Sequence, residues 1–309
     1  LQVVGVGPVG IVIMYLSMSL LGLLSCALVM RGCSEQDQHQ KELYFSAFFI
    51  ATISAACYFT MATGNGLLVL RKSGTGLKSV WAYTNPLMAT EGDPKHPNPL
   101  FDSAYSHAPT YPFFYIRYMS ALLTSPIMVH YICQVVGVPR STTWSLLFCS
   151  VAMVASLFAA AGITGSSRWT FWVVGIVFYF AVAIVMSRDV GNLAMKRGKT
   201  VFLVFTQLST VVLVSWCVLA VLWLVGIGCK AVSSDVDICM HALVELATQC
   251  SFASALVKGG KLLGPSLTRD RQRREMAGTG YDTPEGQAGP LFSGAGVLGD
   301  DLGDLEDNL

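Results

Sequence analysis

The chain has 309 residues, of which 53% are hydrophobic and only 13% are charged, and its mean hydropathy is +0.56. About 25% of the residues in a soluble globular domain are charged, so this composition excludes an ordinary soluble protein. The formal net charge of +1 gives no basis for nucleic-acid binding, which a strongly basic chain would indicate. The charges are concentrated between apolar runs and near the C-terminal end, which is typical of helical membrane proteins.

Seven apolar runs are each long enough, or nearly so, to cross a membrane as a helix of about 20 residues. They cover residues 8–30, 43–70, 111–138, 142–164, 169–186, 201–226 and 236–263. The sequence therefore predicts an all-α membrane protein with a seven-transmembrane helix bundle over residues 1–263. Residues 264–309 are polar, glycine-rich and finally acidic, and we expect them to form a separate, disordered tail.

The connections between the runs differ in character. Residues 71–110 form a long segment rich in Gly, Pro, Asn and Asp, which is either a solvated loop, a hairpin or a partner surface. Residues 188–199 are predicted to form a basic loop. Cys229 and Cys239 lie close in sequence, and the sequence leaves open whether they form a disulfide, because that depends on geometry.

The distribution of lysine and arginine predicts the orientation. The connections after the first, third and fifth runs, together with the tail, hold thirteen of these residues, and the other connections hold six. Cytoplasmic segments carry the excess of positive charge. We therefore expect a cytoplasmic C-terminal tail and an N-terminus that lies outside or in a lumen, in a membrane that the sequence does not identify.

Residues 111–126 read YPFFYIRYMSALLTSP. This stretch resembles the third helix of the microbial (type I) rhodopsins, where an aromatic cluster precedes Arg-Tyr-x-Asp-Trp-Leu-x-Thr-Thr-Pro. Residues 58–66 resemble the end of the second helix of that family. Trp216 and Trp223 resemble the two tryptophans that enclose retinal on the sixth helix. The resemblance extends over about residues 8–263 and implies the seven-helix bundle of microbial-rhodopsin type.

The resemblance also locates the position of the retinal-binding lysine. The family binds retinal through a lysine four residues after an acid on the seventh helix, and these positions match Gln249 and Glu245. No lysine occurs between Lys230 and Lys258, so a small shift of the alignment does not restore one. An amide nitrogen is not a nucleophilic amine. The resemblance therefore implies that this chain cannot bind retinal covalently.

Other positions of the family's retinal pocket have also changed. The proton acceptor of the third helix matches Ser120, and the bulky neighbours of retinal match Ala121 and Leu219. The expected vestigial pocket consists of Tyr58, Ala121, Thr124, Trp216, Leu219 and Trp223. The smaller side chains either leave a cavity or have allowed their neighbours to collapse into it. A cavity would admit non-covalent retinal, a carotenoid or a lipid tail.

Arg117 and Glu245 are the two charges that lie deep within apolar runs. An unpaired charge in a membrane costs several kcal/mol, so we expect these side chains to approach each other and to sum to zero. On this basis, replacing Glu245 by Gln is expected to destabilise the protein. Asp237 is either an acid at a helix start or an equivalent of the family's proton-release group, and His241 is placed to contact Glu245.

Our leading functional hypothesis is an opsin-like membrane protein that acts as a non-photochemical binding, scaffold or regulatory subunit. The alternatives are an ion or proton transporter or channel, and a photoreceptor with non-covalent retinal. The expected partners are the lipid bilayer and either further copies of the chain or another subunit of a membrane complex. We expect neither an enzyme, because no nucleophile–base set is present, nor a metal site, because no CxxC spacing occurs.

Overall fold

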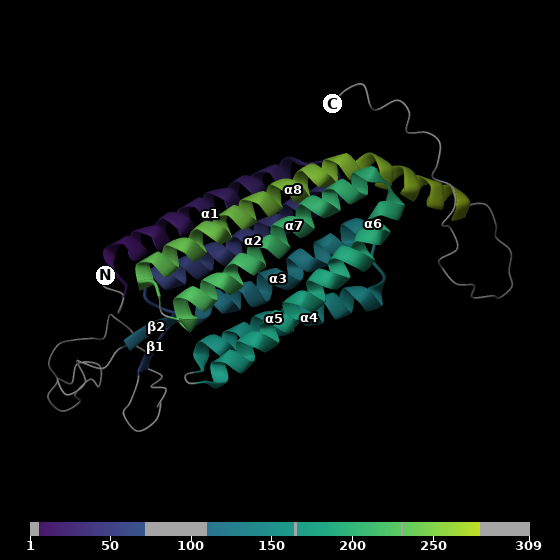
Figure 1. Ribbon diagram of the computed structural model, residues 1–309. Helices are drawn as coiled ribbons and strands as arrows, with labels where there is room; N and C mark the ends of the chain where they lie inside the picture. The colour runs from purple at the N-terminus through teal and green to yellow at the C-terminus, as the bar shows by residue number, and fades with distance from the viewer. Residues whose placement is uncertain (1–5, 72–109, 164–165, 230, 279–309) are drawn as a thin grey trace, which may run out of the picture. The chain divides into compact units, whose positions relative to one another are not determined.

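In the part of the chain that the structure describes, seven helices are long and apolar enough to cross a membrane, and they lie side by side in a bundle (Figure 1). The computed structural model describes residues 6–71, 110–163, 166–229 and 231–278. All seven spans belong to one compact unit, Leu1–Pro265, and Ser266–Leu309 form a second unit. The predicted all-α membrane fold is therefore confirmed, while the predicted domain boundary at residue 263 stays a prediction.

The spans follow one another through the bundle in chain order. The helices are α1 (Pro8–Ser34), α2 (Gln38–Ala62), α3 (Tyr115–Val136), α4 (Arg140–Gly162), α5 (Ser167–Val185), α7 (Lys199–Trp223) and α8 (Ser234–Gly278). Helices that are consecutive in sequence pack together, as α1 does with α2 and α4 with α5, because their connections are short. Helices α5 and α7 are joined by side chains: the Tyr179 hydroxyl donates to the Leu213 carbonyl at 3.2 Å, and the Trp172 ring stacks on that of Trp223.

A small antiparallel sheet takes the place of two predicted helix ends. Strand β1 (Leu67–Arg71) pairs with β2 (Thr110–Phe114). The predicted spans 43–70 and 111–138 were therefore wrong at these ends, since α2 stops at Ala62 and α3 begins at Tyr115. The hairpin alternative for the long connection is confirmed at its base, and residues 72–109 lie outside the described residues.

Glycines explain why α2 ends earlier than predicted. Gly64 and Gly66 have φ angles of +78° and +75°, a left-handed conformation that glycine adopts without steric cost and that commonly ends a helix. Hydropathy alone does not record this break, because the apolar residues continue into β1.

Two helices extend beyond their predicted ends. After α5, the π-helical turn η3 (Met186–Val190) and α6 (Gly191–Arg197) continue the helical path, so the prediction of a basic loop over residues 188–199 was wrong. The path ends at Gly198, whose φ is +122°. The predicted disordered tail was wrong for residues 264–278, which α8 includes, and residues 279–309 lie outside the described residues.

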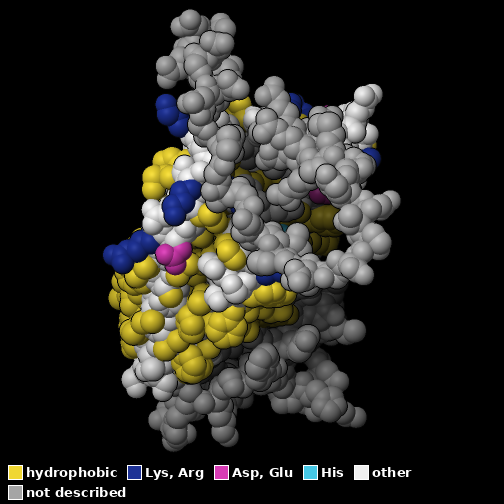
Figure 2. Space-filling view, turned by 90° about the vertical axis from the view of Figure 1, so that its right-hand side faces the viewer, with side chains coloured by type: hydrophobic (Ala, Val, Ile, Leu, Met, Phe, Trp, Pro, Cys, Tyr) yellow, Lys and Arg dark blue, Asp and Glu magenta, His cyan; other side chains and the backbone are white. Residues whose placement is uncertain are grey.

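Large apolar side chains cover the outside of the bundle. Trp144 and Phe148 on α4 are 70% and 67% exposed, and Val177 on α5 is 62% exposed. Figure 2 shows a broad hydrophobic area on one face, with Lys and Arg side chains along its margin. Exposed apolar surface of this extent is unfavourable in water but is expected opposite lipid tails. The bundle is thus built to lie in a bilayer.

Most buried side chains are apolar, and the buried polar ones are uncharged with few exceptions. Buried side chains such as Ile50, Ile132, Leu208 and Phe252 form the main core cluster. Among the described residues, Arg117 is the one Asp, Glu, Lys or Arg that is buried, with 8% of its surface exposed. The fold therefore brings a cationic side chain into the bundle, and the groups that neutralise it define the candidate site.

Replacing Gly66 by Ala should lower the unfolding temperature of the detergent-solubilised protein. A β-carbon at this position would lie 2.8 Å from the β-carbon of Ile116 and would require a left-handed backbone. The expected loss in the free energy of unfolding is about 2 kcal/mol.

The matched control is Gly22→Ala on α1. A β-carbon there meets no atom within 4 Å, and alanine is the better helix former, so the melting temperature should be unchanged or higher. Equal melting of the two variants would contradict the assigned turn geometry.

Candidate functional site

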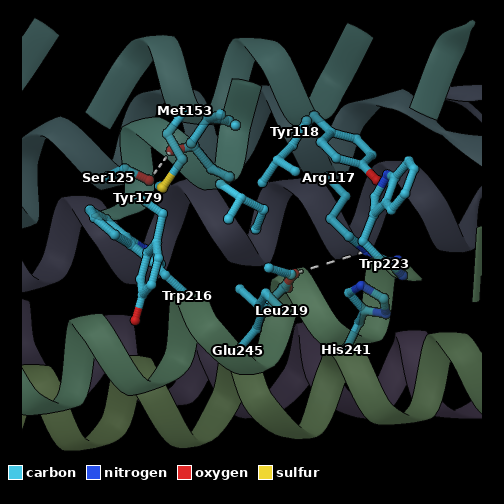
Figure 3. A pocket seen from close by; sticks show the side chains of 16 residues that line it. Arg117, Tyr118, Ser125, Met153, Tyr179, Trp216, Leu219, Trp223, His241 and Glu245 are labelled. Carbon is cyan, nitrogen blue, oxygen red and sulfur yellow. Dashed lines mark hydrogen bonds and ion pairs between the residues drawn. The ribbon is translucent and has the colours of Figure 1, made fainter. Parts of the chain in front are cut away.

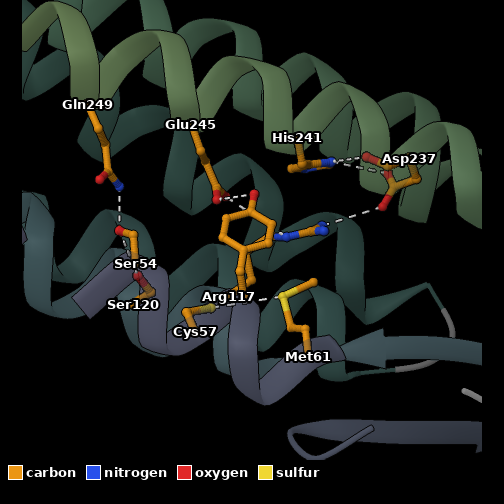
Figure 4. Close-up of polar contacts among 10 residues, drawn as sticks. Ser54, Cys57, Met61, Arg117, Ser120, Asp237, His241, Glu245 and Gln249 are labelled. Atoms are coloured by element: carbon orange, nitrogen blue, oxygen red, sulfur yellow. Dashed lines mark hydrogen bonds and ion pairs between the residues drawn. The ribbon is translucent and has the colours of Figure 1, made fainter. Parts of the chain in front are cut away.

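Arg117 lies between two carboxylates of α8. Its Nη1 donates a hydrogen bond of 3.5 Å to Oδ2 of Asp237, and its Nε lies 3.9 Å from Oε1 of Glu245. Figure 4 shows the guanidinium between the two acidic side chains. The expected approach of Arg117 and Glu245 is therefore confirmed, and Asp237 is an additional, closer partner.

The three site residues of α8 share one face of the helix. Asp237, His241 and Glu245 are spaced four residues apart, so their side chains lie one helical turn from each other. Nδ1 of His241 lies 2.9 Å from the carbonyl oxygen of Asp237 and 3.4 Å from its Oδ1. Because a carbonyl oxygen only accepts, His241 donates through Nδ1. The histidine thus contacts Asp237, and no described contact joins it to Glu245.

Tyr58 joins α2 to this cluster. Its hydroxyl donates a hydrogen bond of 2.5 Å to Oε2 of Glu245, and its side chain is fully buried. Glu245 therefore has the guanidinium of Arg117 near one oxygen and the tyrosine hydroxyl at the other. The predicted pocket residue Tyr58 belongs to the charged cluster and does not line the cavity described below.

The predicted charge balance of this interior was incomplete. Arg117 and Glu245 alone sum to zero, but Asp237 adds a second carboxylate at 12% side-chain exposure. With neutral His241, one positive charge faces two negative charges. Asp237 lies in the first turn of α8, as the simpler interpretation expected, and it also pairs with Arg117. A sequence does not show which charges will meet when they lie 120 residues apart.

Gln249 lies one turn beyond Glu245 on α8, in a neutral polar group. The Gln249 side chain is buried, with 7% exposed, and its amide nitrogen donates a hydrogen bond to the Ser54 hydroxyl. Ser54 lies 3.4 Å from the Ser120 hydroxyl, and Thr124 donates to the Ser120 carbonyl at 3.0 Å. Ser120 thus extends the contact between Gln249 and Ser54 to α3, separately from the ionic cluster, whereas the described hydrogen bond of Thr124 lies within its own helix.

A cavity lies beside the ionic cluster. It is bounded by side chains of α3, α4, α5, α7 and α8 (Figure 3), and its empty volume, which includes its open mouth, is about 690 Å³. Of the predicted pocket residues, four line it: Ala121, Trp216, Leu219 and Trp223. The smaller side chains of Ala121 and Leu219 therefore leave a cavity, and their neighbours have not collapsed to fill it. Tyr58, Thr124 and Gln249 do not line this space.

The cavity is polar at one end and apolar over most of its length. Arg117, His241 and Glu245 form the polar end, and the apolar part is lined by Met153, Val154, Leu157, Ile176, Trp216, Leu219 and Ala220. Among the described residues that line it there is no lysine. An aldehyde in this space therefore meets no amine with which it can form a Schiff base.

Sequence reasoning missed the contributions of α4 and α5 to the cavity. Met153 and Leu157 on α4 and Ile176 and Tyr179 on α5 lie in apolar stretches without any distinguishing spacing. The free thiols of Cys229 and Cys239 leave the possible disulfide unformed, so no covalent link joins α7 to α8 at this end.

Comparison with known families identifies one that covers most of the chain. A model of the bacteriorhodopsin-like protein family matches residues 10–259. The chain is 21% identical to the bacteriorhodopsin-II-like protein of Haloquadratum walsbyi over 248 residues, which cover 78% of this chain and 87% of that protein. It is 23% identical to opsin-1 of Neurospora crassa over 206 residues, covering 66% of this chain and 61% of that protein.

Solved structures show the same arrangement of helices. The crystal structure of a light-driven proton pump from Leptosphaeria maculans has a TM-score of 0.68 and 17% identity, and covers 84% of this chain and 96% of that chain. The light-driven proton pump of Coccomyxa subellipsoidea has a TM-score of 0.66 and 19% identity, covering 82% and 97%. At these identities the structures establish the likeness of the fold.

Removing both carboxylates of the cluster should lower the free energy of unfolding by more than the sum of the two single substitutions. Asp237→Asn or Glu245→Gln leaves Arg117 with one anionic partner, so each is expected to cost about 1 kcal/mol. The double variant leaves a buried, unpaired guanidinium, for which about 3–5 kcal/mol is expected. The expectation from sequence that Glu245→Gln destabilises the protein is thus kept, with a small magnitude, because Asp237 still faces Arg117.

Thermal or denaturant unfolding of the purified protein in one detergent measures this coupling. Strict additivity of the two substitutions would show that Arg117 does not depend on the two carboxylates jointly.

Proposed function

The chain belongs to the bacteriorhodopsin-like family, as the motif of residues 111–126 predicted, and from that premise we propose that it moves protons or ions across a membrane without covalently bound retinal. The solved proteins with the same fold include light-driven proton pumps, which favours the transport alternative over our leading interpretation of a non-photochemical scaffold. The position that matches the retinal lysine holds Gln249, which favours a path that works without a Schiff base.

The observation that carries this proposal is the buried cluster of Asp237, Arg117 and Glu245. Ionisable groups inside a membrane are costly, and they are retained where they serve ions or protons. The short hydrogen bond from Tyr58 to Glu245 extends the cluster from α8 to α2. The carboxylates of Asp237 and Glu245 and the hydroxyl of Tyr58 supply successive sites at which a proton can reside while it crosses part of the bilayer, and Arg117 stays protonated beside them.

Further polar pairs lie toward the other end of the bundle, separate from the ionic cluster and from each other. Ser54 on α2 binds Gln249, and two turns earlier Ser46 binds the hydroxyl of Tyr131. Eight residues of helix span about 12 Å. Ile50 lies midway on the same face and is 2% exposed. We infer that this apolar layer closes the path at rest, so that conduction requires water or a side-chain movement at Ile50.

The orientation follows from the predicted charge asymmetry. The starts of α3 and α8 then face the outside or a lumen, and the ionic cluster lies nearer that side. The end of α8 faces the cytoplasm. The lipid bilayer is the partner that the seven apolar helices require, and an assembly with further copies or another membrane subunit remains part of the proposal.

A second candidate function is the binding of an apolar ligand, and the cavity beside Trp216 and Trp223 favours it. Retinal, a carotenoid or a lipid tail held there without a covalent bond would make the protein a photoreceptor or a regulatory binding subunit. The two functions are compatible, because the polar end of the cavity contains Glu245 of the ionic cluster.

Proteoliposomes that carry a pH-sensitive dye test transport directly. With an imposed pH gradient and no retinal, the wild-type protein is expected to conduct protons in the dark at least several times faster than empty liposomes. Glu245→Gln should reduce the flux to the background, because Gln does not hold an exchangeable acidic proton.

The matched control is Glu42→Gln, since the side chain of Glu42 is exposed at the start of α2, and its flux should equal that of the wild type. Repeating the assay with other ion gradients separates protons from other ions. A wild-type flux at the level of empty liposomes for every ion, with and without retinal and light, would refute transport and leave the binding function.

A further inference from the structure

The ionic cluster contains two carboxylates and one guanidinium. Arg117 contributes one positive charge, whereas ionised Asp237 and Glu245 contribute two negative charges. Nδ1 of His241 donates to the Asp237 carbonyl, an arrangement that neutral histidine already satisfies. A net charge inside the bundle is costly. One further positive charge balances two ionised carboxylates, whether it is a proton on a carboxylate, a proton on His241, which lies 3.4 Å from Asp237, or a bound cation.

The atoms that the cluster presents to the cavity are acceptors. Arg117 has two nitrogens without a hydrogen-bond partner, Nε and Nη2, and the indole nitrogen of Trp223 also lacks one, but all three have almost no accessible surface. These donors are thus closed off from a ligand. The Glu245 side chain is 19% exposed and lines the cavity. A ligand head therefore meets a carboxylate and not a free guanidinium.

The Glu245 carboxylate can accept further hydrogen bonds from the head group of a ligand. Its Oε2 accepts from Tyr58, whereas Oε1 has only the guanidinium of Arg117, at the long distance of 3.9 Å. A carboxylate oxygen accepts more than one hydrogen bond. His241 also lines this end, and with its proton on Nδ1 the second ring nitrogen is an acceptor. Both groups favour a donor with positive charge.

The remainder of the cavity suits an apolar body. Leu157 of α4, Ile176 of α5 and Leu219 of α7 form walls, and Trp216 lies among them (Figure 3). The cavity thus combines an acceptor end of negative charge with a long apolar part.

We propose that this cavity binds a lipophilic primary amine as its ammonium form. The head donates hydrogen bonds to Glu245, and the apolar body lies against Trp216, Leu157 and Leu219. The bound ammonium brings the sum of the charges of Arg117, Asp237 and Glu245 to zero. The inference names the ligand class for the site of the proposed function and rests on it only through the shared Glu245.

Three retinoids with the same apolar body test the role of the head. Retinylamine carries a cationic head, retinol a neutral one and retinoic acid an anionic one, and each quenches the fluorescence of nearby tryptophans. In titrations of the purified protein in one detergent, retinylamine should bind about tenfold more tightly than retinol, a difference of about 1.4 kcal/mol, because hydrogen bonds between charged groups are stronger than neutral ones. Retinoic acid should bind most weakly.

Two variants separate recognition of the head from occupation of the cavity. Glu245→Gln should bring the affinities for retinylamine and retinol to within about twofold, because the charged acceptor is lost. Ala121→Phe should abolish saturable binding of all three ligands, since Ala121 lines the cavity. Leu123→Phe on the same helix is the matched control, because Leu123 is 53% exposed on the outside, and it should bind as the wild type does.

The inference is overturned if the three retinoids bind equally, if the acid binds most tightly, or if the preference for the amine persists in Glu245→Gln. If Glu245→Gln does not fold, the ranking of heads in the wild type and the pair Ala121→Phe and Leu123→Phe still decide the outcome. The titration does not depend on transport. If the flux assay fails but the protein clearly prefers the amine, the proposed transport alone is refuted. If the protein conducts protons but does not prefer the amine, this inference alone is refuted.

Discussion

A guanidinium inside a membrane bundle has to be neutralised by neighbouring groups, and Arg117 is neutralised by two carboxylates of α8. This requirement fixes the start of α3 against the start of α8. The hydrogen bond from Tyr58 to Glu245 then adds α2. The cavity lies on the other side of the cluster, where α4, α5 and α7 complete the wall. One ionic contact thus determines which helices enclose the polar interior and where its ligand space begins.

The absence of a lysine changes what this interior does. In the wall of the cavity the described residues offer a carboxylate, a histidine and aromatic rings, but no amine. At the position that resembles the retinal lysine, Gln249 forms a neutral hydrogen bond with Ser54. The ionic cluster therefore lacks the positive charge that a bound Schiff base would supply, and it is open to a proton or a cationic ligand. The proposed proton conduction and the proposed ligand binding both rest on the two carboxylates that face one guanidinium.

The sequence predicts the seven spans and the contact between Arg117 and Glu245, because long apolar runs and buried charges follow from membrane energetics alone. It does not predict that Asp237 joins them, since an acid at a helix start ordinarily faces solvent or stabilises the helix dipole. The strands after α2 and the continuation of α5 were also missed. Hydropathy is insensitive to both, because a strand and a helix can have equally apolar residues, and basic residues can extend a helix beyond the membrane.

The central claim is that this interior operates without retinal bound to a lysine. Incubation of the purified protein with retinal, reduction with borohydride and mass spectrometry of the peptides measure this directly, because borohydride converts any Schiff base to a stable amine. The account predicts no retinyl group on the peptides that contain Glu245 and Gln249 or on any other peptide of the seven spans. A stoichiometric retinyl-lysine within the bundle would contradict it.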